Sequence, residues 1–138
     1  MAATNPIFRP VYDRLKSILE PYAPRMYVSA DTDTTYGLDL APPEERIPAT
    51  WFGGVRLGKR YVSYYLMPIY ADPKMLDDVS LALRKRMQGK SCFNLTKIDE
   101  TLIAELEDLT RRGYDRTAGD AEWGKRQRAH WNRARTNR

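Results

Sequence analysis

The sequence predicts a single α+β domain, in which a mostly antiparallel sheet of four to five strands carries an N-terminal helix and C-terminal helices packed on it. The length of 138 residues suits one domain with one core. Apolar residues follow helical spacing before residue 25, alternate between residues 25 and 70, and return to helical spacing after residue 99. Finally, the glycine-led pair Gly58-Lys59 lies between two alternating runs, which is typical of a β-hairpin.

The N-terminal helix begins near Pro10, because proline suits a first helical turn. Its apolar residues recur at the spacing of one helix face. They are Val11, Leu15, Ile18, Leu19 and Tyr22. Pro21 and Pro24 close the segment.

Alternating or β-branched segments predict the strands of the sheet. They cover residues 26–30, 36–40, 50–57, 60–67 and 91–95. Glycine in the first position of the loop at Gly58-Lys59 predicts a two-residue type II′ turn. Two adjacent prolines make 41–48 a loop, since proline cannot donate to a strand ladder.

The remaining helices are predicted from their caps. Asp72 precedes a proline and starts a helical segment. Ser80 caps a short helix over 81–88, which Gly89 ends. Asp99 caps the final core helix, whose inward residues are Leu102, Leu106 and Leu109.

Positive charge is concentrated at the C-terminal end. Residues 1–110 contain 14 Lys and Arg against 15 Asp and Glu, whereas residues 111–138 contain 9 against 3. We therefore divide the chain into an α+β domain over 1–113 and a basic helical tail over 114–138. The tail predicts a nucleic-acid contact through Lys125, Arg126, Arg128, Arg133 and Arg135. Its tryptophans, Trp123 and Trp131, equally suit a terminal helix that docks on the domain.

The expected compartment is the cytoplasm. Cys92 is the only cysteine, so no intramolecular disulfide can form, which favours a reducing environment. No apolar run approaches the roughly 18–20 residues of a membrane span. The N-terminus also lacks the layout of a signal peptide, and we expect no membrane association.

No combination of residues predicts catalysis, and we expect a binding domain rather than an enzyme. Cys92 would need a base to act as a nucleophile, and the single histidine, His130, lies in the tail. One Cys and one His are too few for a usual zinc site. Three acidic pairs suit turns and helix caps better than a metal site; they are Asp31 with Asp33, Glu44 with Glu45, and Asp77 with Asp78. We expect no cofactor.

Aromatic residues gather in the predicted sheet. Six of the nine tyrosines lie there, at positions 27, 36, 61, 64, 65 and 70. Alternation places Tyr61, Ser63 and Tyr65 on one face of their strand and Tyr64 on the other. Because both faces are apolar to aromatic, we expect helices to cover one face and part of the second. The rings then form either a packed core or an aromatic binding surface.

The stretch over 54–109 resembles the YdhG-like bacterial domains. The features that carry this resemblance are the hairpin, the aromatic strand RYVSYYL at 60–66, the proline-started segment from Asp72, the strand GKSCFNL at 89–95 and the helix capped by Asp99. These domains are loosely grouped with frataxin-type iron chaperones. The resemblance implies a small α+β fold with an antiparallel sheet, and it implies iron delivery as one alternative role.

The leading functional prediction is a small binding or adaptor domain that uses the aromatic sheet face or a cleft beside it, with a small molecule or a protein as partner. The predicted ligand-binding residues are Lys59, Arg60, Tyr64, Tyr65, Lys90 and Ser91. These residues cluster around the hairpin and the last strand. A frataxin-like iron chaperone is the first alternative, and a nucleic-acid protein acting through the tail is the second.

Overall fold

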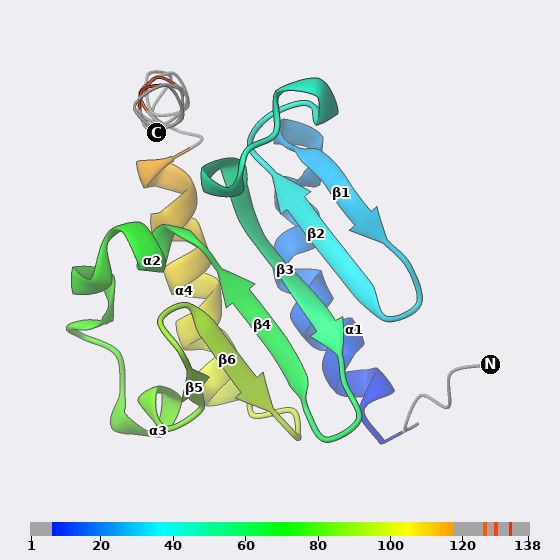
Figure 1. The fold of residues 1–138 in the computed structure, drawn as a ribbon. Helices are drawn as coiled ribbons and strands as arrows, with labels where there is room; N and C mark the ends of the chain where they lie inside the picture. The colour runs from blue at the N-terminus through cyan, green and yellow to red at the C-terminus, as the bar shows by residue number, and fades with distance from the viewer. Residues whose placement is uncertain (1–6, 118–125, 127–128, 130–132, 134–138) are drawn as a thin grey trace.

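The computed structural model describes residues 7–117 together with residues 126, 129 and 133. The described part has a layer of helices and a six-stranded sheet (Figure 1). The long helices are α1 (Arg9–Leu19) and α4 (Glu100–Arg116). The strands are β1 (Tyr27–Asp31), β2 (Thr35–Asp39), β3 (Trp51–Leu57), β4 (Val62–Leu66), β5 (Met87–Gln88) and β6 (Cys92–Leu95). The short helices are η1 (Glu20–Arg25), η2 (Pro43–Glu45), η3 (Pro48–Thr50), α2 (Pro68–Ala71), η4 (Pro73–Leu76) and α3 (Leu81–Arg84).

The strands follow the order β1-β2-β3-β4-β6-β5, and every neighbouring pair is antiparallel. The predicted α+β class is confirmed, but the sheet has six strands rather than four to five. The additional strand is β5, which we expected to be the end of a helix over 81–88. Helix α3 stops at Arg84 instead, because pairing with Phe93 in β6 gives Met87 both a ladder partner and a place against the core. Gly89, at a φ of 73°, then reverses the chain in a left-handed conformation that favours glycine.

The turn between β3 and β4 lies one residue later than predicted. The Gly58 N–H donates to the Tyr61 carbonyl at 3.0 Å, so Lys59 and Arg60 occupy the centre of the turn. A type II′ turn needs a positive φ at its first central position, which Gly58 does not have, and that prediction is wrong. Glycine serves a close approach here, since a Cβ on Gly58 would lie 2.8 Å from the Tyr61 carbonyl oxygen.

The core lies between the helices and the sheet. From α1 it receives the predicted residues Val11, Leu15, Ile18 and Leu19. Tyr12, outside the predicted stripe, is also buried, whereas Tyr22 lies in η1 and is only partly buried. From α4 and the sheet it receives, among others, Leu102, Ile103, Leu106, Leu109, Phe52, Tyr64, Leu66 and Phe93. Burial of these side chains is the main stabilising contribution to a domain of this size.

Two of the predicted helix caps are confirmed. The Ser80 hydroxyl accepts a hydrogen bond from the Leu83 N–H at 3.1 Å. The Asp99 carboxylate accepts from two N–H groups in the first turn of α4, at 3.1 and 3.3 Å. Asp72 does not cap with its side chain; its carboxylate forms an ion pair with Arg116 instead.

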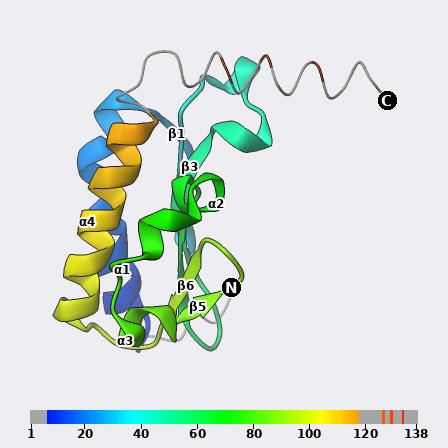
Figure 2. The same ribbon diagram turned by 90° about the vertical axis from the view of Figure 1, so that its left-hand side faces the viewer.

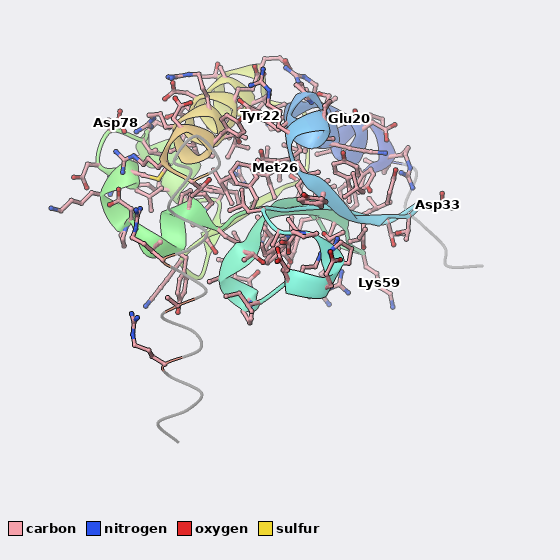
Figure 3. The ribbon with its side chains drawn as sticks, turned by 90° about the horizontal axis from the view of Figure 1, so that it is seen from above. Glu20, Tyr22, Met26, Asp33, Lys59 and Asp78 are labelled. Atoms are coloured by element: carbon pink, nitrogen blue, oxygen red, sulfur yellow. The ribbon has the colours of Figure 1, made fainter. Side chains whose placement is uncertain are left out.

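The long helices α1 and α4 lie side by side against one face of the sheet (Figure 2). On the second face, where we expected partial helical cover, the described residues contribute the short turns η2 and η3 at one end (Figures 2 and 3). Seen from above, Lys59 lies on this second side, away from Glu20 and Tyr22 in the helix layer (Figure 3). We call the second side the open face of the sheet.

Helix α4 continues past the predicted domain boundary at residue 113. Gly113 lies inside the helix, where a Cβ would approach the Pro68 ring of α2 to 3.0 Å, and Thr117 beyond it is still buried. Residues 114–117 therefore belong to the packed domain rather than to a separate tail. None of the described helices is long and apolar enough to cross a membrane.

Candidate ligand-binding face of the sheet

The open face carries two adjoining hollows. The larger has a volume of about 870 Å³ and the smaller a volume of about 380 Å³. Arg56 and Tyr65 line both, so the hollows form one continuous surface across the sheet. Other lining residues include Trp51, Lys59, Arg60, Tyr61, Ser63 and Gln88.

An aromatic pair occupies one end of this surface. The rings of Trp51 and Tyr65 lie 5.4 Å apart at an angle of 42°, and both are partly exposed. The Trp51 indole N–H donates to the Gly53 carbonyl at 3.0 Å, which fixes the orientation of the ring. The indole is thus held in place before any ligand arrives.

The indole lies beside two cross-strand glycines. Gly37 of β2 and Gly54 of β3 are directly paired, and Cβ atoms on them would lie 3.8 and 3.5 Å from the Trp51 ring. A Cβ on Gly54 would also come within 2.6 Å of the Tyr36 carbonyl oxygen, which is closer than a Cβ can approach. Glycine at position 54 thus allows a close approach between the backbones of β2 and β3.

A chain of polar side chains crosses the other end. The Ser63 hydroxyl lies 2.7 Å from the Asn94 carbonyl oxygen, and the Asn94 amide nitrogen donates to the Gln88 carbonyl oxygen at 2.8 Å. The Tyr61 hydroxyl donates to the same Gln88 oxygen at 3.3 Å. Within the described residues the amide nitrogen of Gln88 makes no hydrogen bond, so two N–H donors remain for a ligand.

Three cations border the larger hollow. Arg56, Lys59 and Arg60 line it, and none of its lining residues is acidic among the residues that the structure describes. No ion pair or side-chain hydrogen bond joins these three cations to another residue in the described part of the chain. By contrast, arginines of the helix layer are engaged: Arg14 binds Glu100 and Glu107 at 2.9 and 3.0 Å.

Cys92 also lies on this face, half-buried beside Ser63 and Tyr65. Burial raises the pKa of its thiol above the usual value, although hydrogen bonds with these two neighbours act in the opposite direction. The thiol therefore stays protonated at neutral pH, and its Sγ lies 3.5 Å from the Asn94 carbonyl oxygen. Cys92 is a structural side chain of the face and is not poised as a nucleophile.

The six predicted site residues lie in three separate places. Lys59, Arg60 and Tyr65 line the larger hollow. Lys90 and Ser91 lie at the opposite end of β4, where the Ser91 carbonyl accepts from the Leu66 N–H. There the Lys90 ammonium lies 5.5 Å from the centre of the Tyr70 ring, and the Ser91 hydroxyl lies 3.6 Å from the Met67 sulfur.

Tyr64 lies on the other face of β4, fully buried beneath the helices. Its hydroxyl lies 2.6 Å from the Thr110 hydroxyl of α4, and burial raises the pKa of Tyr64 far above its usual value. It is therefore part of the core and cannot reach a ligand on the open face.

The predicted site residues omit Trp51, Arg56, Gln88 and Asn94, which also belong to this surface. Arg56 is directly opposite Ser63, because β3 and β4 pair Leu57 with Val62. A turn centred on Gly58-Lys59 would have paired Leu57 with Arg60 and shifted this neighbourhood by two residues. The available signal was the alternation that placed Tyr61, Ser63 and Tyr65 together. Either turn places Arg56 opposite a member of this set, since a shift of two residues leaves each side chain on the same face.

The acidic pairs do not converge. No group of three or more His, Cys, Asp or Glu side chains in the described residues is placed to hold a metal ion. Asp31 forms an ion pair with Lys16 at 3.3 Å, and Asp78 with Arg112 at 3.3 Å. Iron binding stays a prediction that no feature of the described residues favours.

Most of the predicted tail contact lies outside the described residues. Lys125, Arg128 and Arg135 fall there, as do His130 and both tail tryptophans. Arg126 and Arg133 are described as exposed helical residues.

Comparison with known proteins gives no match, whether to a protein-family model, to a curated protein or to a solved structure.

Proposed function

We propose that this chain is a binding domain that takes an anionic ligand on the open face of its sheet. The observation that carries the proposal is the set of cations Arg56, Lys59 and Arg60 around a hollow whose described lining residues include no acidic side chain. Unpaired cations next to aromatic rings attract a ligand that combines negative charge with a flat, polarisable group. The fixed Trp51 indole and the neighbouring Tyr65 ring provide the surface for that flat group.

Family membership is a second part of the proposal. We infer that the chain is a YdhG-like domain from the hairpin, the aromatic strand, the proline-started segment, the strand over 89–95 and the Asp99-capped helix. The hairpin, the aromatic strand and the strand over 89–95 also contribute to the open face, so a shared surface of this kind would be expected in domains of the same type.

The binding proposal can be tested with Trp51 as a local reporter. In a Trp123→Phe/Trp131→Phe background, Trp51 is the only tryptophan. Its fluorescence emission is recorded while the full-length chain is titrated with adenosine triphosphate, sodium tripolyphosphate or heparin. We expect a saturable change for at least one of these anions, weakened about 10-fold or more by Arg56→Gln, since a charge-assisted contact contributes about 1.5–3 kcal/mol.

Arg25→Gln is the matched control. Its guanidinium lies 5.8 Å from the centre of the Tyr114 ring in the helix layer, so this variant removes the same charge away from the open face. It should leave the titration unchanged. Equal losses for Arg56→Gln and Arg25→Gln, or no change in Trp51 emission with any of the three anions, would reject the proposed function.

A further inference from the structure

The open face, measured across the strands, is wider than a single small ligand. Its lining residues extend from Ser29 on β1 to Gln88 on β5, at opposite edges of the six-stranded sheet. Five inter-strand spacings of about 4.8 Å give a width of roughly 24 Å. A ligand that used the whole surface would therefore be an extended chain rather than one compact molecule.

Aromatic rings and cations lie next to one another on this surface. Tyr65 is paired with Gly54, and Arg56, two residues further along β3, is paired with Ser63. Two residues of strand span about 7 Å, which is comparable to the distance between the base and the phosphate of one nucleotide. A base stacked on Trp51 and Tyr65 would thus bring its phosphate to Arg56, with Lys59 and Arg60 available to the next phosphates.

The hydrogen-bonded polar side chains at the other end of the face provide donors and acceptors that suit the edges of bases. The free amide N–H groups of Gln88 are donors, and the Tyr61 and Ser63 hydroxyls can accept as well as donate. Unpaired bases present such edges, whereas the bases of a duplex are stacked and paired within the helix.

From these observations we propose that the open face binds single-stranded nucleic acid, with bases stacked on Trp51 and Tyr65 and phosphates paired with Arg56, Lys59 and Arg60. This inference rests on the proposed function, since it names the anion that the face accepts. It differs from binding through the C-terminal tail, because the residues that carry it belong to the sheet and to the turn between β3 and β4.

The test uses the full-length chain and a fluorescein-labelled 20-nucleotide oligothymidylate, with binding followed by fluorescence anisotropy. Three triple variants each remove three positive charges. The open-face triple is Arg56→Gln, Lys59→Gln and Arg60→Gln; the helix-layer triple is Arg9→Gln, Arg25→Gln and Arg111→Gln; the tail triple is Lys125→Gln, Arg126→Gln and Arg128→Gln. Far-ultraviolet circular dichroism and thermal melting establish that each variant is folded.

We expect the open-face triple to weaken binding at least 10-fold and to flatten the plot of log K against log salt by about 2, since each phosphate contact on a single strand contributes about 0.7 to the slope. The other two triples should keep the slope. Tyr65→Leu should weaken binding about 5- to 150-fold, the loss of one stacked base, while Tyr65→Phe retains it. A 20-base-pair duplex should bind at least 10-fold more weakly than the single strand.

Four results would overturn the inference. Loss confined to the tail triple would place the contact outside the sheet, and equal losses in all three triples would mean unspecific charge attraction. Equal affinity for duplex and single strand would remove the role of stacking. No binding of the oligonucleotide, although adenosine triphosphate or heparin changes Trp51 emission, would reject nucleic acid while the proposed function stands.

Discussion

The Tyr64 hydroxyl donates its proton to the Thr110 hydroxyl across the buried interface between β4 and α4. The two oxygen atoms lie 2.6 Å apart, and the Thr110 hydroxyl in turn lies 2.7 Å from the Leu106 carbonyl oxygen. A carbonyl can only accept, so the single Thr110 proton points to Leu106 and the Tyr64 proton must point to Thr110. Because Tyr64 is the donor and Thr110 the acceptor, removal of one hydroxyl should change the stability of the fold by a different amount from removal of the other.

Thr110→Val should therefore destabilise the fold more than Tyr64→Phe. Removal of the Tyr64 hydroxyl loses one buried hydrogen bond, worth about 0.5–1.5 kcal/mol, and leaves Thr110 bonded to Leu106. Removal of the Thr110 hydroxyl leaves a buried Tyr64 donor without a partner, which costs about 1–3 kcal/mol. Urea unfolding of both variants and of the double variant measures the difference. The double variant should be no less stable than Thr110→Val; additive losses would contradict the assigned direction.

Cys92 should react slowly with thiol reagents while the chain is folded. Because burial raises the pKa of its thiol, the folded protein holds less thiolate at any pH near neutrality than the unfolded chain does. The chain has one cysteine, so the rate of reaction with dithionitrobenzoate reports on this site alone. We expect the pH midpoint of the rate to be higher for the folded protein than for the chain in urea. Coinciding midpoints would contradict the raised pKa.

Two glycines should respond differently to alanine. Gly54→Ala forces a Cβ to within 2.6 Å of the Tyr36 carbonyl oxygen in the adjacent strand, and we expect a loss of about 1–3 kcal/mol in the free energy of unfolding. Gly89→Ala meets no atom within 4 Å but has a φ of 73°, which costs about 1–2 kcal/mol for a side chain.

Asparagine variants distinguish the steric clash at Gly54 from the left-handed backbone at Gly89, because asparagine tolerates the left-handed conformation better than alanine does. Gly89→Asn should be more stable than Gly89→Ala in thermal melts, whereas Gly54→Asn should be no better than Gly54→Ala. An equal ranking at both positions would mean that the backbone conformation at Gly89 does not limit its side chain.

The ionised Asp108 carboxylate should stabilise the fold near neutral pH, and this stabilisation should be lost in acid. The hydrogen bond from Arg111, at 2.6 Å, is the largest cause that lowers the Asp108 pKa below 3.8. The folded carboxyl therefore has the lower pKa, so its contribution is complete above the unfolded value and is lost as the pH falls through the folded value. The side chain is 47% exposed, which limits the effect to below about 1 kcal/mol. Asp108→Asn should reduce the difference in melting temperature between pH 6 and pH 3, and an unchanged difference would contradict the lowered pKa.

Features that depend on a few neighbouring residues could be predicted from the sequence. Ser80 and Asp99 cap their helices because a short polar side chain before a helix accepts from the first free N–H groups. Alternation likewise placed Tyr61, Ser63 and Tyr65 on one side of the strand. Each of these features depends on residues that are at most four positions apart, so it can be predicted from the local sequence.

Features that depend on distant pairing could not be predicted in this way. Whether Tyr64 or Tyr65 faces the core depends on which face of the sheet receives α1 and α4, a choice that the strand itself does not contain. Strand β5 has two residues, too few for a periodic pattern, and exists because β6 offers it a partner. The partner of Arg56 depends on the turn, which is set by the pairing of β3 with β4: the turn at Lys59-Arg60 places Arg56 opposite Ser63, whereas a turn at Gly58-Lys59 would place it opposite Tyr61.

The two ends of the open face carry different chemical groups. At one side of the sheet the indole of Trp51 lies against the glycine pair, and at the other side the amides of Gln88 and Asn94 are joined in a line. No two-fold symmetry relates these ends. A polymer with a chemical polarity of its own, lying across them, would meet unlike groups if it were reversed, so the two orientations of such a chain on this surface differ in energy.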